Sequence, residues 1–293
     1  NDAVYFRDFV SEAQAHGLAH LGDANAKDDY WDRIPTPLRE SISKMSADTV
    51  ERDQYMDFLT NRMFRRSILC RAEPALGTPE TAANQIRKLY IASNPTEKPA
   101  GTNAAGQPMT QFGTEHDQVQ LSDPRPIAAM RHLRGAWPSA VSFSELAAAV
   151  LAQAAANQKD PERNAKALAH MIETCYSLGI VELWSRPTDH ISPAAGQYPR
   201  ATRWARWQAA HLPTVTSLRH LPIKTDDSLR RILPLVDGTR DRKALVAECI
   251  RGNEAAGPAK SESPLANRDP QSLEQLIDAI LQRMASVSLL VSR

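Results

Sequence analysis

The chain has 293 residues, and 35 Lys and Arg residues balance 34 Asp and Glu residues to a formal net charge of +1. This balance excludes a strong global field that would recruit nucleic acid or a membrane, and the length leaves room for about two or three domains. No apolar run reaches the roughly 18–20 residues that cross a bilayer. The three cysteines stand far apart, so we expect free thiols, a cytoplasmic location and no membrane partner.

Glycine usage excludes one large class of cofactor site. Among the 12 glycines no two stand at positions i and i+2, so the chain contains no G-x-G loop of the kind that binds dinucleotides. The chain also begins at Asn1 without an initiator Met. We therefore expect it to be part of a longer protein, with cofactor chemistry lying outside it.

The first 75 residues predict a helical segment with a small pair of strands. Apolar residues recur at spacings of three and four over residues 4–13, which predicts a helix that ends at Gly17. Runs at residues 18–24 and 64–73 favour short strands, which we expect to pair with each other. Ser46 is the expected N-cap of a helix that extends to Met63.

Residues 94–111 are rich in Asn, Pro, Thr, Gly and Ala and show no apolar periodicity, which is typical of a linker or an exposed loop. After it, residues 126–137 predict a helix, and Ser142 with Glu145 forms a capping box for a second one. Asp160 and Pro161 begin a third helix, and a strand is expected at residues 180–184. Three helices followed by a strand indicate a winged helix.

The last hundred residues repeat this plan. A helical stripe runs from Leu229 to Val236, and Asp237 and Gly238 turn the chain into another helix. Asp269 precedes Pro270 at the start of the last helix, and a terminal strand is expected at residues 287–291.

These elements predict a mostly α (α+β) protein in three parts. A helical regulatory segment with a short antiparallel strand pair is followed by two winged-helix-like domains. The expected boundaries give residues 1–98, 99–195 and 196–293.

One segment combines basic and aromatic residues at high density. Such residues can clamp an anionic or extended ligand by stacking and by bidentate hydrogen bonds, whereas the alternative is a packed strap between domains with the tryptophans in the core. Residues 186–231 hold eight Lys or Arg and three Asp, whereas residues 1–60 hold six Lys or Arg and twelve Asp or Glu. We assign no catalytic, cofactor-binding or metal-ligating residue. The candidate partner-binding residues are Arg200, Arg203, Trp204, Arg206 and Trp207.

Several runs of the sequence resemble a known family. Tyr5-Phe6 with Phe9, AHGLAHLGDA, QYMDFLTNRMFRRSILCRAE and, downstream, LPLVDGTRDRKAL are similar to the regulatory region that follows the catalytic domain in bacterial class I S-adenosylmethionine-dependent methyltransferases. Relatives of this type include protein-lysine methyltransferases. The resemblance implies that the two short strands belong to the end of a methyltransferase sheet.

The resemblance implies a non-catalytic, substrate-positioning region whose S-adenosylmethionine-binding domain lies elsewhere. No activity and no cofactor are expected in this chain alone, and S-adenosylmethionine is the cofactor of the implied whole enzyme. The expected partners are a methyltransferase domain in cis or in trans, a protein substrate and a second copy of the chain. The alternative is a winged-helix DNA-binding transcriptional regulator, although the last helix presents acidic rather than basic residues, so we do not expect a nucleic-acid partner.

Overall fold

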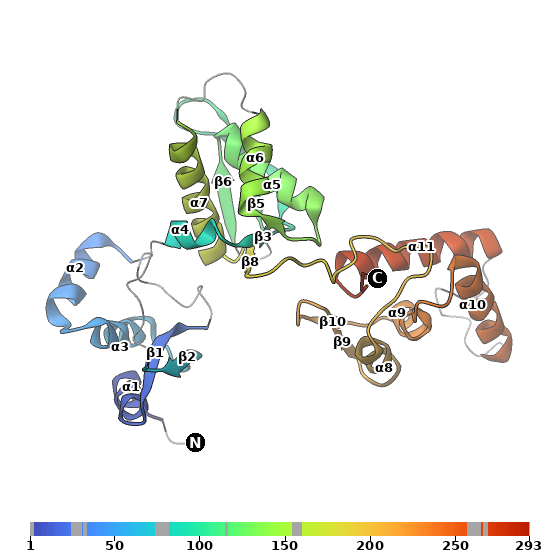
Figure 1. Cartoon of the computed structure of the whole chain (residues 1–293), viewed down its shortest axis with the longest axis horizontal. Helices are drawn as coiled ribbons and strands as arrows, with labels where there is room; N and C mark the ends of the chain where they lie inside the picture. Colours follow the sequence, from blue (N-terminus) through green and yellow to red (C-terminus); the bar gives the residue numbers. More distant parts are fainter. Residues whose placement is uncertain are drawn as a thin grey trace.

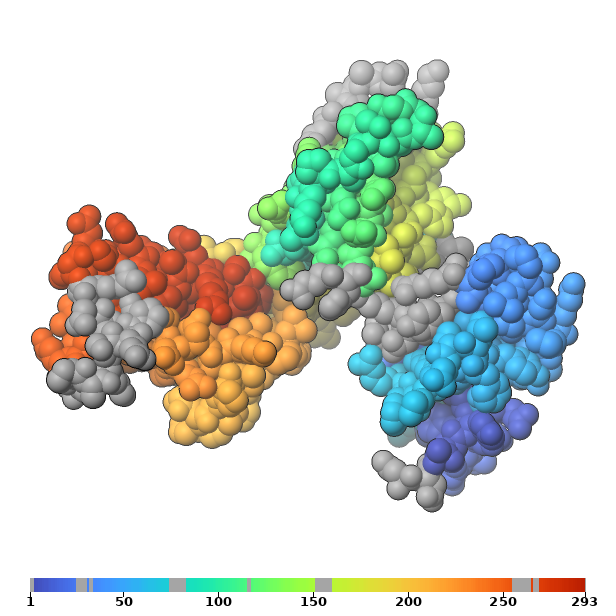
Figure 2. Space-filling view, turned by 180° about the vertical axis from the view of Figure 1, so that it is seen from behind, coloured from blue at the N-terminus to red at the C-terminus, as the bar shows by residue number. Residues whose placement is uncertain are grey.

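The computed structural model describes residues 3–24, 31, 34–73, 82–114, 117–153, 160–256, 265 and 269–292. It has an N-terminal lobe (residues 3–73), a middle lobe (residues 82–184) and a C-terminal lobe (residues 185–292) (Figure 1). Seen from behind, the N-terminal and C-terminal lobes lie on opposite sides of the middle lobe (Figure 2). Helices predominate and the sheets are small and antiparallel, which confirms the mostly α (α+β) class.

The N-terminal lobe contains the predicted pair of strands. Gly17, at a φ of +73°, ends the first helix in the left-handed conformation that glycine favours. The strands pair antiparallel from Leu18 opposite Arg71 to Asp23 opposite Ser67, which confirms the expected pairing. The elements of this lobe are α1 (Phe6–Ala15), β1 (Leu18–Asp23), α2 (Thr36–Met45), α3 (Thr49–Thr60) and β2 (Ser67–Arg71).

The expected cap of the second long helix is wrong. Asp48, not Ser46, caps α3, because its carboxylate accepts the backbone N–H of Glu51 at 2.8 Å. The Ser46 hydroxyl instead donates to the carbonyl of Ile42 at the end of α2, a helix that the sequence did not predict. The helix also ends at Thr60, before Met63, because Asn61 adopts the left-handed conformation.

The N-terminal lobe is held together by a cation as much as by apolar packing. The Arg65 guanidinium contacts both carboxylate oxygens of Asp57, at 3.1 and 2.8 Å, and pairs with Asp23 at 3.1 Å. It also lies 3.8 Å from the ring centre of Phe6. These carboxylates are only 11–12% exposed; Arg65 balances the charge of Asp57, and it shares Asp23 with Arg62, which pairs with Asp23 at 2.9 Å.

The middle lobe packs its helices against a small sheet in which β3 lies between β7 and β8. The capping box forms as predicted: Ser142 Oγ accepts from the Glu145 N–H at 3.2 Å, and the Glu145 carboxylate accepts from the Ser142 N–H at 3.0 Å. Asp160 caps the third helix. The elements are α4 (Ala82–Ile86), β3 (Tyr90–Ala92), β4 (Thr96–Thr102), β5 (Pro108–Gly113), β6 (Gln118–Leu121), α5 (Pro124–Ala136), β7 (Val141–Ser142), α6 (Phe143–Gln153), α7 (Pro161–Ser177) and β8 (Glu182–Trp184).

The expected linker at residues 94–111 is wrong. These residues form most of the β4–β5 hairpin, and β5 pairs further with β6. The hairpin is exposed along most of its length, and Phe112 is its fully buried anchor, so the strands lack the alternation that would have revealed them. The three-part division stays a prediction, but Ala83, Ile86 and Ile91 pack in the middle core and place its start before residue 99.

The C-terminal lobe has its own core, built around Leu245, Ile277 and Leu281, which are all completely buried. Asp269 caps the last helix as predicted. The expected terminal strand is reduced to single bridges, in which Leu290 pairs with Ala201 and Val291 pairs with Ile191. The elements are α8 (Arg203–His211), β9 (Thr214–Thr216), β10 (Pro222–Lys224), α9 (Asp227–Ile232), the 3₁₀ helix η3 (Leu233–Leu235), α10 (Arg242–Ala256) and α11 (Pro270–Ser286).

The Arg65 cluster makes the stability of the N-terminal lobe testable. Arg65→Ala leaves the Asp57 carboxylate buried without a counter-charge, which should cost about 3–5 kcal/mol. Amide protons of β1 and β2 should then exchange with deuterium at least about 100-fold faster. Arg7→Ala is the matched control, because Arg7 is 64% exposed and pairs only loosely with Asp8 at 3.5 Å. Unchanged exchange in Arg65→Ala would refute the role of the cluster.

Candidate functional site

The predicted partner-binding residues lie in and just before α8 of the C-terminal lobe. Thr202 caps this helix by accepting the N–H of Ala205 at 3.0 Å. The face that packs into the lobe consists of Ala205, Gln208 and Ala209, and the Gln208 amide bonds both the N–H and the hydroxyl of Thr216. The two alanines let α8 lie close to the core, so its tryptophans take no part in this packing.

The tryptophans are on the outer face. Trp204 is 58% exposed and Trp207 is 47% exposed, so neither belongs to a packed strap. Their rings stack with centres 5.1 Å apart and planes 13° apart, and the His211 ring stacks on Trp207 at 4.8 Å. We call Trp204, Trp207 and His211 the ring stack.

The three arginines are placed differently. Arg203 is exposed on α8, and Arg206 is half-buried with its Nε shielded from solvent and without an acceptor among the described residues. The aliphatic part of Arg200 lies against Gly238 at the edge of a small cavity that Tyr198 also lines. The structure therefore groups Arg203, Arg206 and the tryptophans on one short helix, with Arg200 just before it.

A second cluster of polar and aromatic side chains, which the sequence did not predict, lies where the middle and C-terminal lobes meet. The Arg219 side chain is 2% exposed and bonds Glu182, the carbonyl of Pro138 and, at 3.0 Å, the hydroxyl of Ser288. Its guanidinium lies 4.1 Å from the ring centre of Trp137 and 5.2 Å from that of Trp184. We call these residues the Arg219 junction.

Two further features fix the geometry of the Arg219 junction. The indole N–H of Trp137 donates to the carbonyl of Ser286 at 2.7 Å, and the indole N–H of Trp184 donates to Glu182 at 3.0 Å. Burial lowers the pKa of Arg219 from its ordinary value, and the charge of Glu182 opposes that shift. The Arg219 junction could not be predicted from the sequence, because no local pattern links Arg219 to residues so distant along the chain.

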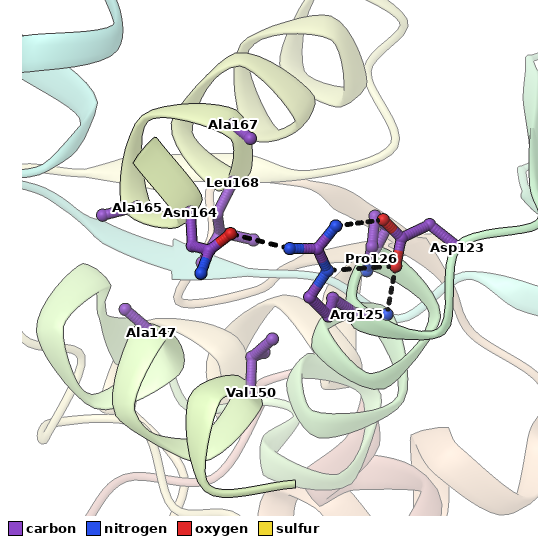
Figure 3. Close-up of a pocket in the computed structure, with 9 residues that line it drawn as sticks. All are labelled: Asp123, Arg125, Pro126, Ala147, Val150, Asn164, Ala165, Ala167 and Leu168. Carbon is purple, nitrogen blue, oxygen red and sulfur yellow. Dashed lines mark hydrogen bonds and ion pairs between the residues drawn. The ribbon is translucent and has the colours of Figure 1, made fainter. Parts of the chain in front are cut away.

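A cavity of about 60 Å³ lies between α5, α6 and α7 (Figure 3). Its walls are largely aliphatic, and at its rim Arg125 bridges Asp123 and the side-chain oxygen of Asn164, the latter at 2.7 Å. These hydrogen bonds hold the pKa of Asp123 below its ordinary value. Because Asp123 is committed to Arg125, the cavity offers space for a few water molecules or a small apolar group but no acid-base pair.

The N-terminal lobe carries an unusual amount of exposed apolar surface. Nine of the fifteen large exposed hydrophobic side chains of the described chain lie there. Phe6 and Val10 of the predicted first stripe are buried, whereas Tyr5 is 61% exposed and packs edge-on against Phe58 at 5.9 Å. The nine residues, which we call the apolar face, are Val4, Tyr5, Leu21, Met45, Phe58, Leu59, Met63, Phe64 and Ile68.

Metal sites, reactive thiols and membrane-spanning helices are three further features that bear on function. In the described residues no group of three His, Cys, Asp or Glu side chains is arranged to hold a metal ion. The thiols of Cys70, Cys175 and Cys249 are free, and burial raises the pKa of Cys175 to about 12, so it is a poor nucleophile. Within the same described ranges, no helix combines the length and apolar character needed to span a bilayer.

Comparison with known families places both ends of the chain. Residues 1–71 match the family described as "Predicted methyltransferase regulatory domain", and residues 197–289 match "PKMT, C-terminal winged helix domain". These matches confirm the resemblance to the regulatory region of methyltransferases. The N-terminal lobe is thus similar to a methyltransferase regulatory domain, and the C-terminal lobe is similar to the winged helix domain of PKMT.

Individual proteins are similar to the chain over almost its whole length. "Uncharacterized protein RP789" of Rickettsia prowazekii (strain Madrid E) is 26% identical over 304 residues, which cover 99% of this chain and 54% of the relative. The structure of PKMT2 from Rickettsia typhi superposes with a TM-score of 0.78 at 19% identity and covers 100% of this chain and 59% of PKMT2. PKMT2 in complex with AdoHcy gives 0.78 at 18% identity, covering 98% and 58%. The chain thus spans little more than half the length of these relatives.

The described residues do not fit S-adenosylmethionine. A nucleotide-like cofactor of this class binds at the carboxyl ends of parallel strands beside a glycine-rich turn. Here the sheets are antiparallel, with two or three strands each, and the sequence contains no G-x-G. We therefore assign no cofactor-binding step to this chain.

The Arg219 junction predicts how firmly two lobes are joined. Arg219→Ala leaves the Pro138 carbonyl without its donor and Glu182 without its counter-charge, which should cost about 1–3 kcal/mol. We expect a larger radius of gyration by small-angle X-ray scattering and faster proteolysis between residues 185 and 200. Arg219→Lys should rescue only part of this effect, because an ammonium cannot form the same planar fork between the rings. Arg203→Ala is the control, and scattering curves that do not differ among the variants would contradict the prediction.

Proposed function

We propose that this chain is the non-catalytic regulatory and substrate-positioning region of an S-adenosylmethionine-dependent methyltransferase. Its N-terminal lobe docks on the cofactor-binding domain, and its middle and C-terminal lobes hold a protein substrate. The observation that carries this proposal is the apolar face, because it lies in the residues that match the methyltransferase regulatory domain.

The apolar face needs a partner. Fully burying one such side chain is worth about 1.5–3 kcal/mol, and contiguous exposed apolar surface in soluble proteins usually marks an interaction site. Leu21 and Ile68, 55% and 41% exposed, lie on the paired strands β1 and β2, where Ile68 is opposite Gly22 and Leu21 occupies the adjacent bulge. A domain whose sheet has an unpaired edge strand and an apolar face would cover both side chains.

The β1–β2 pair supports the same partner. It is a two-stranded sheet in the described part of the chain, and such a pair is marginal in water when it stands alone. Each strand has an outer edge whose backbone groups can accept another strand. The proposed catalytic domain supplies that strand, and a second copy of this chain is the competing cover, as in a homodimer.

The C-terminal parts supply the positioning. The Arg219 junction links the middle and C-terminal lobes, so a substrate that contacts both lobes is held in one orientation relative to them. The free cysteines fit a reducing compartment, and we propose a cytoplasmic location.

The reading frame that precedes Asn1 in the gene tests the proposal. It should encode a domain with a G-x-G loop that binds S-adenosylmethionine by calorimetry, whereas the 293-residue chain alone should not bind it. When the two parts are expressed separately and mixed, they should associate. Phe64→Asp should weaken this association at least about tenfold, because the side chain is 86% exposed and available for burial.

Tyr176→Asp is the matched control, because Tyr176 is an exposed aromatic residue of the middle lobe and should leave association unchanged. Neither substitution should lower the melting temperature of the chain by more than about 2–4 °C. A reading frame without such a domain, or association that survives Phe64→Asp, would contradict the proposed docking.

The rival function, DNA binding by a winged helix, predicts a different affinity. The outer face of α11 carries Glu274 and Asp278, and Asp278 pairs with Arg242, so phosphates would meet an acidic surface. We expect duplex DNA to bind no tighter than about 10⁻⁴–10⁻⁶ M at physiological salt, without sequence preference. Fluorescence anisotropy with a pool of random duplexes measures this, and a selective nanomolar complex would favour the regulator.

A further inference from the structure

We propose that the outer face of α8 is a docking surface for an acidic, extended polypeptide segment. The idea that this segment belongs to a protein substrate rests on the proposed function. The idea that α8 binds such a segment rests on the geometry of α8 alone. The ring stack binds apolar side chains of the segment, and Arg203 and Arg206, which form no ion pair with the described residues, bind its carboxylates.

The ring stack is organised before any partner arrives. Trp204, Trp207 and His211 are spaced at i, i+3 and i+7, which places them on one helix face. The carbonyl of Trp207 accepts a hydrogen bond of 2.8 Å from Nδ1 of His211, and this bond fixes the ring against its neighbour. Because the rings are already ordered against one another, a partner that covers them loses little side-chain entropy in doing so.

The position of the rings is not explained by packing within the chain. The buried face of α8 is complete with Ala205, Gln208 and Ala209, and the tryptophans contribute to neither of the two hydrophobic cores. Leu212, which ends the helix, and Leu221, in the hairpin that packs on α8, are also exposed, at 38% and 51%. The exposed apolar side chains of this lobe are therefore not confined to the rings.

Charge selects the partner. In the described part of the chain no ion pair is formed by Arg200, Arg203 or Arg206, whereas thirteen other arginines pair with carboxylates. The α8 sequence itself contains no Asp or Glu. Guanidinium groups beside exposed aromatic rings complement carboxylates that flank apolar or proline side chains.

A polypeptide fits this surface better than a single-stranded nucleic acid does. Nucleic acid would bind by stacking its bases on separate aromatic faces. Here the inner faces of the rings are in contact with each other, at 5.1 and 4.8 Å between centres, so no base can enter between them. The aliphatic area of Leu212 and Leu221 suits side chains rather than bases.

The experiment measures binding of a 12-residue peptide of alternating glutamate and proline to the full 293-residue chain, by tryptophan fluorescence and by calorimetry. A peptide with lysine in place of glutamate and a 12-residue oligothymidine are the competing ligands. We expect the glutamate peptide to bind, with an affinity that falls as salt is added, and the lysine peptide not to bind.

Two independent variants test the residues. Trp204→Ala with Trp207→Ala, and separately Arg203→Glu with Arg206→Glu, should each weaken the glutamate peptide at least about tenfold. The matched controls are Tyr176→Ala, another exposed aromatic residue, and Arg251→Glu, an exposed arginine of the same lobe that pairs with Glu248. Both controls should bind as the unmodified chain does, and the melting temperatures of all variants verify that they fold.

The proposal is overturned if the glutamate peptide does not bind, or if it binds both double variants as tightly as it binds the unmodified chain. Tighter binding of oligothymidine would assign the surface to nucleic acid instead. Because this experiment needs no catalytic domain, its failure would leave the docking of the N-terminal lobe untouched, and failure of that docking would leave this result intact.

Discussion

The guanidinium of Arg219 is the contact on which the relative placement of two lobes depends. A buried cation is costly unless its charge and its donors are all matched, and here Glu182 balances the charge while a carbonyl and a hydroxyl accept the remaining hydrogen bonds. The two indoles on either side exclude water and offer their faces to the cation. Because the partners come from both lobes, these requirements are met in one arrangement of the lobes.

The N-terminal lobe is stabilised in a different way, because its apolar core is small. In the part of this lobe that the structure describes, Phe6, Val10, Ala13, Ile42 and Met56 are the buried apolar side chains, which make a small core. Arg65 and its carboxylates complete the lobe with charge rather than with apolar volume. The apolar residues that could have enlarged the core face outward instead, which is the arrangement expected of a lobe that finishes its folding against a neighbour.

The sequence predicts what neighbouring residues decide and misses what distant residues decide. Asp160, Asp269 and the capping box of Ser142 with Glu145 act within a single helical turn, and all of them form as expected. The β4–β5 hairpin was missed because few of its side chains enter the core. The Arg219 junction was missed because a cation and its partners lie many residues apart, and no spacing rule joins them.

The candidate surface on α8 shows the same limit. The residues were identified from composition alone, but whether the tryptophans face the core or the solvent depends on which side of α8 packs on Thr216 and the core, and that is a property of the whole lobe. Sequence could name the chemical groups. It could not orient them.

The strand order of the middle lobe has a consequence for synthesis. β3 is the central strand of its sheet, yet it leaves the ribosome before β7 and long before β8, its two neighbours. One edge of β3 therefore stays unpaired in the nascent chain until Trp184 has been translated, although β7 can pair with the other edge earlier. The C-terminal lobe waits in the same way, because Ala201 pairs with Leu290 near the end of the chain. Both lobes are completed by their last paired segment, so a ribosome that stalls within either lobe should release a product with an incomplete lobe.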